Sequence, residues 1–316
     1  MNVIANVNNS YVKKPLSGRF AKVLRRQWPL YLMVIPGVIF YIIFKYIPLF
    51  GSIIAFEDYK VSKGIFGSPW VGLDNFKAFF AYQELTRVFV NTVIVSTYSL
   101  ILTFPMPIVF ALLLNEINNR YFKRSIQTLS YLPHFISWVI IGGLTFDILS
   151  STGMVNSIRN LMGLENILFM QQEKYFRGIV IITGIWKEMG WGSIIILAAI
   201  SNINIEYYEA AIVDGAGRWK QTILITLPLL LPTIVIIFLL SVGHFLELGF
   251  DRIYNLLTPM TYSVGDVIDT YVYRAGIQQG RYSLTTAVGL FQSVIGFVLV
   301  YGCNKISRKV WDGGLW

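Results

Sequence analysis

The sequence predicts an all-α integral membrane protein with six transmembrane helices. Of its 316 residues, 55% are apolar and 14% are charged, and the mean hydropathy is +0.59. Soluble domains typically contain about 25% charged residues, and disordered chains contain fewer apolar residues, so this composition excludes both classes of protein. A helix needs about 20 apolar residues to cross roughly 30 Å of hydrocarbon, and six stretches of the chain are long enough.

The six predicted spans differ in their charged residues. Four of them lack Asp, Glu, Lys and Arg: 88–114, 125–146, 229–246 and 282–304. The first span, 27–56, contains Lys45, which we expect to extend toward the membrane surface. The fourth span, 178–201, contains Lys187 and Glu188. Ionisable groups in lipid are costly, so those of the fourth span are functional candidates.

Basic residues set the predicted orientation. Six of them precede Trp28: Lys13, Lys14, Arg19, Lys22, Arg25 and Arg26. Cytoplasmic segments are enriched in Lys and Arg, and an even number of spans returns the chain to the same side, so both termini are predicted to be cytoplasmic. The net charge of +9 is then a consequence of topology and does not indicate nucleic-acid binding.

The predicted spans divide the chain into consecutive segments. These are a basic cytoplasmic segment (1–28), a first transmembrane helix (29–56), an extracytoplasmic segment (57–87), a five-helix core (88–304) and a cytoplasmic tail (305–316). In one outer segment, apolar residues at helical spacing predict a short amphipathic helix, either on the membrane surface or packed on the bundle: Met154, Val155, Ile158, Leu161 and Met162.

The chain has few metal-ligating or redox-active side chains. Cys303 is its only cysteine, and His134 and His244 are its only histidines. A single cysteine excludes an intramolecular disulfide, and two histidines argue against a histidine-rich metal site. We expect both histidines to be packed or capped rather than catalytic.

The cytoplasmic segment 202–228 is predicted to form a short helix, a break and a second helix. Asn204 suits the N-cap, and Glu206 and Glu209 lie in the first turns, where the helix dipole favours negative charge. Gly215 and Gly217 can both adopt a positive φ and end the helix. The result is a small, stiff projection held off the membrane.

This segment resembles the EAA loop of permease subunits from binding-protein-dependent ABC importers. The matching residues are Glu209, Ala210, Ala211, Gly215, Ile225, Leu227 and Pro228. The loop also has the family's position, between the antepenultimate and penultimate spans. Residues 70–76, 91–92 and 282–308 resemble the carbohydrate-importing, maltose-type branch of these type I permeases, whereas Ile205 stands where many relatives have proline.

The resemblance implies a type I importer permease in the bacterial cytoplasmic membrane. Its coupling loop would dock on a partner ATPase through Glu209, Ala210, Ala211, Asp214, Gly215, Ala216, Gly217, Arg218 and Trp219. ATP and Mg would belong to that ATPase, because this chain has no Gly-x-x-x-x-Gly-Lys-Ser/Thr motif, and no catalytic residue, metal or cofactor is expected in it. The implied partners are two ATPases, a second permease, favoured as a different chain, and an extracytoplasmic substrate-binding protein.

Acidic and indole side chains in the spans are candidates for the path of a carbohydrate. Carboxylates accept hydrogen bonds from sugar hydroxyls, and indole rings stack on the apolar faces of sugar rings. The candidates are Trp186, Glu188, Trp191, Asp147 and Glu247. In the alternative interpretation, Lys187 pairs with one of these carboxylates, while Asp147 and Glu247 reach the outer headgroups.

Two other functions are compatible with a multi-span membrane protein. One is a secondary transporter driven by an ion gradient, but such proteins often contain internal repeats and none is visible here. The other is an intramembrane enzyme that uses Asp147, Glu188 and Glu247, although their unequal expected depths argue against one compact site. The branch resemblance favours an oligosaccharide or modified sugar as substrate and does not identify it.

Overall fold

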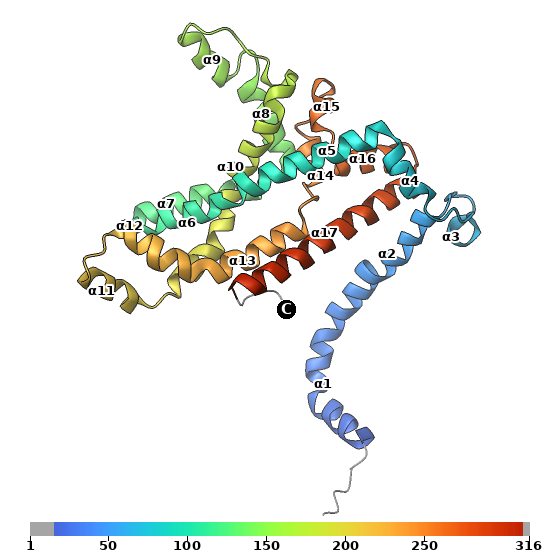
Figure 1. Ribbon diagram of the computed structural model, residues 1–316, viewed down its shortest axis with the longest axis horizontal. Helices are drawn as coiled ribbons and strands as arrows, with labels where there is room; N and C mark the ends of the chain where they lie inside the picture. The colour runs from blue at the N-terminus through green and yellow to red at the C-terminus, as the bar shows by residue number, and fades with distance from the viewer. Residues whose placement is uncertain (1–15, 312–316) are drawn as a thin grey trace, which may run out of the picture. The chain divides into compact units, whose positions relative to one another are not determined.

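A computed structural model describes residues 16–311, which are helical almost throughout (Figure 1). Six helical stretches are long and apolar enough to cross a membrane, which confirms the predicted number: Gln27–Phe56, Gln83–Asn115, Trp138–Leu161, Glu173–Ser201, Arg218–Gly243 and Tyr282–Lys309. Predictions for 1–15 and 312–316 lie outside the described residues. The chain forms two compact units, Met1–Ile53 and Ile54–Trp316.

From Leu16 onward, the first unit is one long helical run. Helix α1 (Leu16–Tyr41) continues through a π-helical turn, η1 (Ile42–Tyr46), into α2 (Ile47–Phe50) and the start of a 3₁₀ segment, η2 (Gly51–Phe56). The π-helical turn precedes Pro48, the second residue of α2. Proline cannot donate a backbone hydrogen bond, so a widened turn here accommodates it without ending the helix.

The second unit begins with a short outer segment and the second span. The outer segment carries α3 (Gly64–Gly67) and α4 (Asp74–Ala81), and its only β pairing is an isolated bridge between Glu57 and Trp70. The span consists of α5 (Gln83–Tyr98), a π-helical turn η3 (Ser99–Thr103) and α6 (Pro105–Asn115). Again the widened turn lies directly before a proline-rich helix start.

The predicted continuous span 125–146 is wrong in one respect, because the helix is broken. Helix α7 (Arg120–Tyr131) ends in a 3₁₀ turn, η4 (Leu132–Phe135), and α8 (Trp138–Leu149) starts after it. Pro133 lies in that turn and is buried. Alone, the 12 residues of α8 rise only about 18 Å, less than the roughly 30 Å of a bilayer core, so the third crossing needs residues beyond α8.

The outer connection after α8 folds on itself. At Gly153 a Cβ atom would lie 2.3 Å from the backbone oxygen of Asp147, so only glycine fits this turn. Helix α9 (Met154–Leu161) confirms the predicted short helix, and the turn η5 (Phe169–Gln171) leads on to the next span. Asn156 is fully buried and donates to the carbonyl oxygens of Ser150 and Ile167, both at 2.8 Å.

Helix α10 (Glu173–Ser201) is the central helix of the second unit and contacts α6, α7 and α13. It approaches α7 closely at Gly190, where a Cβ would lie 2.1 Å from the carbonyl oxygen of Ser130. The fifth span consists of α12 (Arg218–Gln221), a π-helical turn η6 (Thr222–Thr226) and α13 (Leu227–Gly243). The sixth, α17 (Tyr282–Trp311), lies beside α13 (Figure 1).

Short elements between the fifth and sixth spans form a cap that contributes to the hydrophobic core and is joined by hydrogen bonds. They are α14 (Phe250–Tyr254), η7 (Pro259–Thr261), α15 (Tyr262–Gly265), α16 (Ile268–Tyr271) and η8 (Val272–Gln278). Asp266 is fully buried here, and both of its carboxylate oxygens accept hydrogen bonds from the Arg274 guanidinium, at 3.0 and 2.7 Å. The same arginine donates to Glu84 of α5 at 2.9 Å, which joins the cap to the second span.

A cavity between the spans and a coupling loop

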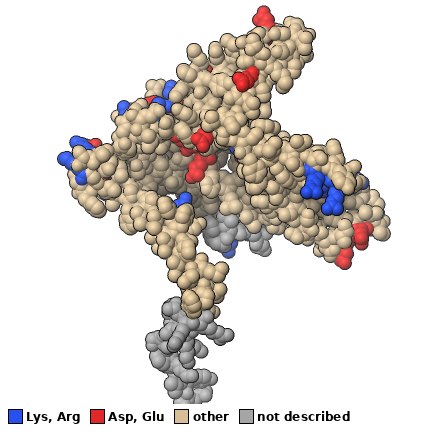
Figure 2. All heavy atoms as spheres, turned by 180° about the vertical axis from the view of Figure 1, so that it is seen from behind, with Lys and Arg blue, Asp and Glu red and all other residues tan. Residues whose placement is uncertain are grey.

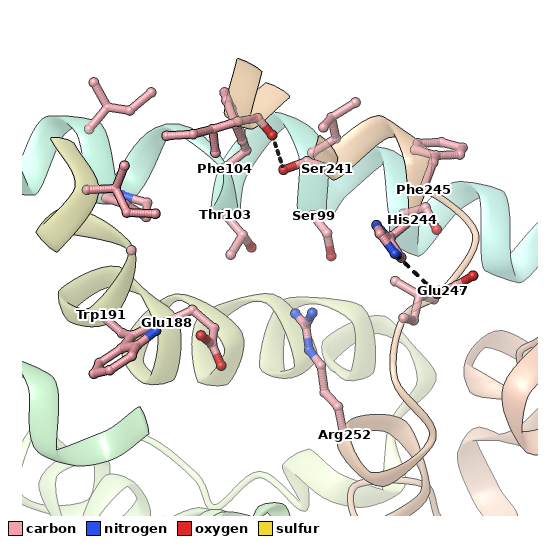
Figure 3. A pocket seen from close by; sticks show the side chains of 18 of the residues that line it. Ser99, Thr103, Phe104, Glu188, Trp191, Ser241, His244, Phe245, Glu247 and Arg252 are labelled. Carbon is pink, nitrogen blue, oxygen red and sulfur yellow. Dashed lines mark hydrogen bonds and ion pairs between the residues drawn. The ribbon is translucent and has the colours of Figure 1, made fainter. Parts of the chain in front are cut away.

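A cavity of about 310 Å³ lies between η3 and α6 on one side, α10 on another, and the chain from α13 to α14 (Figure 3). Three of the predicted path residues, Glu188, Trp191 and Glu247, line it together. Its lining also includes polar residues that the sequence did not single out: Ser96, Ser99, Thr103, Ser241 and Arg252. The cavity therefore combines carboxylates, an indole ring, hydroxyls and one guanidinium.

Glu188 is held by the broken third span. One of its carboxylate oxygens lies 3.0 Å from Nδ1 of His134, in the 3₁₀ turn η4. The His134 ring stacks on Trp191, with 4.5 Å between centroids and 2° between planes. His134 is thus packed and bonded, as predicted, and it fixes the positions of the two path residues from α10.

Among the described residues, Lys187 pairs with no carboxylate, which corrects the alternative considered from the sequence. Its Nζ donates to the carbonyl oxygens of Pro133, His134 and Ile136, at 3.3, 2.7 and 2.5 Å. These carbonyls lie in and just after η4, between the end of α7 and the start of α8, and that of Pro133 also accepts from the Ile136 backbone nitrogen at 3.1 Å. Lys187 therefore stabilises the break and, through it, the position of His134.

Arg252, in α14, is the one charged residue among the cavity residues that the sequence did not single out. Its Nη2 donates to the carbonyl oxygen of Val180 at 2.8 Å, and its guanidinium lies 5.8 Å from the Trp138 ring centroid. Nε is buried and has no hydrogen-bond partner in the part of the chain that the structure describes. Burial lowers the pKa of the guanidinium to about 10, and the charge of Glu188 partly opposes this shift, so the group stays charged at neutral pH.

Three hydroxyls in the second span complete the cavity wall. Oγ of Ser96, Oγ of Ser99 and Oγ1 of Thr103 are buried and have no hydrogen-bond partner within 16–311. Their spacing of three and four residues places them on one face of the helix. That spacing was visible in the sequence and could have marked a polar stripe facing the interior of the bundle.

The predicted coupling residues form one exposed projection, built on α11 (Ile205–Val213; Figure 1). The predicted cap is confirmed, because Oδ1 of Asn204 accepts from the Glu206 backbone nitrogen at 3.1 Å. Gly215 follows the helix with a φ of 75°, and the next nitrogen, of Ala216, donates to the Ala211 oxygen at 2.8 Å. This hydrogen bond and the positive φ are those of a Schellman motif.

The predicted role of Gly217 is wrong, because its φ is −66° and it precedes α12 instead of ending α11. The loop is tied to the fifth span by a 2.9 Å hydrogen bond between Tyr208 and Thr226. Arg218 lies 3.7 Å from Glu116 at the end of the second span. Glu209, Ile212 and Trp219 are exposed.

Comparison with known proteins identifies the family that carries this loop and cavity. Residues 103–311 match the model of the family described as binding-protein-dependent transport system inner membrane component. The chain belongs to this family. It is a permease, the membrane subunit of a binding-protein-dependent ABC importer, and the matched range contains most of the cavity wall and the whole α11 loop.

Relatives of the permease include two proteins of Bacillus subtilis (strain 168). The protein LplB is 44% identical over 296 residues, which cover 93% of each chain. The polygalacturonan/rhamnogalacturonan transport system permease protein YteP is 43% identical, over 96% of this chain and 95% of its own. A solved structure of a bacterial ABC transporter involved in the import of the acidic polysaccharide alginate is 43% identical, with a TM-score of 0.86, and covers 93% of this chain and 99% of that one.

Two predicted path residues of the permease lie outside the cavity. Trp186 lines a separate apolar groove between α8 and α10, together with Ile141 and Leu144. Asp147 is exposed near the end of α8. Most of the surface shown in Figure 2 carries no charge, as expected where helices face lipid, and acidic atoms are visible in its hollowed centre.

Proposed function

We propose that this permease forms part of the pore of an ATP-driven importer that moves an oligosaccharide into the bacterial cytoplasm. The main support is the cavity, in which Trp191 and Glu188 share a lining with the hydroxyls of Ser99 and Thr103. Its volume lies at the lower end of the range of ligand pockets, about 300–1,000 Å³. The names of several relatives support a carbohydrate substrate, including a polygalacturonan permease and arabinooligosaccharide permeases.

The α11 loop is the proposed contact with a cytoplasmic ATPase that binds ATP and Mg. Ile212, Val213 and Trp219 are 63%, 88% and 76% exposed, and apolar side chains gathered outside the membrane favour a protein partner. Glu209, which has no side-chain partner in the described structure, adds a charge to this surface. A second permease, two ATPases and an extracytoplasmic binding protein complete the proposed assembly in the cytoplasmic membrane.

The geometry gives a route from the loop to the cavity. Helix α11 follows α10 after three residues, Asn202, Ile203 and Asn204, and α10 carries Glu188 and Trp191. On its other side the loop is bonded through Tyr208 to the fifth span. Movement of a docked ATPase would therefore shift two cavity-lining helices together, as alternating access requires.

The test is uptake by the complete transporter in proteoliposomes, with the Glu209→Lys and Gly215→Ala variants. Glu209→Lys reverses a charge at the proposed interface. Gly215→Ala introduces a side chain at a φ of 75° where no atom lies within 4 Å, so its effect is backbone strain alone, of about 1–2 kcal/mol. We expect both variants to lose most ATP-driven uptake and to retain less ATPase on purification.

The matched control is Gly163→Ala, because Gly163 has the same φ of 75°, also in open space, but follows the outer helix α9. This variant should carry similar strain and keep its ATPase. Normal uptake and ATPase retention in both loop variants would contradict the coupling role. Uptake that follows an ion gradient without ATP, or turnover of a saccharide by the permease alone, would contradict the proposed function.

A further inference from the structure

We infer that Arg252 binds the carboxylate of an acidic saccharide and makes the cavity selective for uronate-containing oligosaccharides. This inference rests on the proposed function. It goes beyond it by assigning a negative charge to the substrate and its recognition to Arg252. It starts from the ionisable side chains that line the cavity: Glu188, His244, Glu247 and Arg252.

Each carboxylate of the cavity has an imidazole beside it. Glu188 lies 3.0 Å from His134, and Glu247 lies 4.0 Å from His244. Arg252, in contrast, has no carboxylate within 4.0 Å among the residues that the structure describes. Its one hydrogen bond is to the neutral carbonyl of Val180, and Nη1 makes none. A desolvated cation with one neutral partner is unfavourable by itself and favours binding of an anion.

The Arg252 guanidinium is held in a fixed position. The Val180 carbonyl fixes Nη2, and the Trp138 ring lies alongside at 5.8 Å. Gly184 of α10 leaves room for the group, since a Cβ there would lie 2.3 Å from Nη2. Figure 3 shows the tip of Arg252 reaching into the cavity from α14, with Glu188 on the neighbouring wall. A fixed planar fork loses little entropy when it binds a carboxylate in bidentate geometry.

The rest of the lining suits a sugar that carries such a carboxylate. Ser99 and Thr103 face the cavity from the wall opposite α10 (Figure 3), and their hydroxyls have no protein partner. Unsatisfied buried hydroxyls favour a ligand with several hydrogen-bonding groups. Two relatives have acidic polymers in their descriptions, polygalacturonan in one and alginate in the other. A neutral saccharide would satisfy the hydroxyls and leave the guanidinium without an anion.

The experiment measures binding to the purified transporter complex without its binding protein, so that selectivity is measured at the permease. The probes are trigalacturonate and its methyl ester, which have the same ring sequence and differ in charge. We expect the wild type to bind the acid at least tenfold more tightly than the ester. Arg252→Gln should remove that difference by weakening acid binding about 10- to 100-fold, the range for a charge-assisted hydrogen bond. Arg252→Lys should restore part of it.

A second variant separates substrate binding from a structural role. If Arg252 served only as a distant counter-charge for Glu188, Glu188→Gln would change acid binding in the same direction as Arg252→Gln. If Arg252 binds the substrate carboxylate, Glu188→Gln removes a nearby repulsion and should raise the acid-to-ester affinity ratio. Thermal melting of each variant establishes that it is folded.

Three outcomes would overturn the inference: equal wild-type affinity for acid and ester, an unchanged ratio in Arg252→Gln, or no binding of either probe. None of them removes the proposed function, which would still be supported by ATP-dependent uptake of a neutral oligosaccharide. Conversely, failure of the wild type to import any saccharide would contradict the proposed function, whatever the binding result.

Discussion

Two arginines in the second unit occupy similar surroundings and have opposite sets of partners. Arg274 lies 5.3 and 5.6 Å from the rings of Tyr262 and Tyr271, and Arg252 lies 5.8 Å from that of Trp138. Arg274 donates to both oxygens of buried Asp266 and to Glu84. Arg252 donates to one carbonyl oxygen.

The comparison separates a cation that holds the fold from one that is available to a ligand. The hydrogen bonds that Arg274 donates to Asp266 and Glu84 raise the pKa of Arg274, whereas desolvation lowers that of Arg252. A charge with a complete set of partners has little to gain from a new anion. A desolvated charge with a single neutral partner has much to gain, which is why binding sites so often contain such groups.

The largest effect is expected when the paired arginine is removed. Arg274→Met would leave the Asp266 carboxylate, which is fully buried, without a counter-charge. Breaking a buried ion pair in this way typically destabilises a protein by about 3–5 kcal/mol. The melting temperature in detergent should therefore fall sharply, and it should fall less in Arg274→Lys. An unchanged melting temperature for Arg274→Met would remove the contrast between the two arginines.

The second prediction applies the same assay to the unpaired arginine. Arg252→Met keeps the apolar stem and removes a desolvated charge, so the melting temperature should stay the same or rise. Binding of trigalacturonate should be lost in the same variant. Stabilisation together with loss of binding is the expected signature of a functional group. Destabilisation comparable to that of Arg274→Met would make Arg252 a structural residue.

Structural features could be predicted from the sequence where the residues that determine them are close together along the chain. Long apolar runs, four of them uncharged, predicted six spans. Asn204 and Gly215 predicted both ends of α11, because capping depends on residues within one turn. The backbone conformation of Gly217 could not be predicted, because both glycines can adopt a positive φ and only the tertiary path of the loop determines which one does.

The cavity depends on contacts between distant residues, so most of it was not predictable. The break after α7 is stabilised by Lys187, 51 to 54 residues further along the chain. Without that contact, an uncharged run with one proline resembles a continuous span. Arg252 follows the fifth span and looks like an outer-loop charge until the fold places it against Val180, 72 residues earlier.

The Arg252 guanidinium can also be displaced without being removed. In Gly184→Ala the new methyl group would meet Nη2 of Arg252, so the guanidinium must shift. We expect the acid-to-ester affinity ratio to fall about three- to tenfold, less than in Arg252→Gln, because the charge remains near the cavity. Gly178→Ala, on the same helix with no atom within 4 Å of its Cβ, is the control and should leave the ratio unchanged. A fall in both variants would point to a general disturbance of α10.

The smallest effect is expected for a neutral group on the opposite wall. Ser99→Ala removes a buried hydroxyl that has no protein partner, so the fold should not be destabilised. If that hydroxyl binds a sugar hydroxyl, affinity should fall about two- to tenfold, and equally for trigalacturonate and its methyl ester. Ser241 lines the same cavity, but its hydroxyl already donates to the carbonyl oxygen of Ile237 at 2.9 Å. Ser241→Ala should therefore weaken binding less than Ser99→Ala does. If Ser99→Ala weakened binding of the acid alone, recognition of the substrate's charge would extend beyond Arg252 to Ser99.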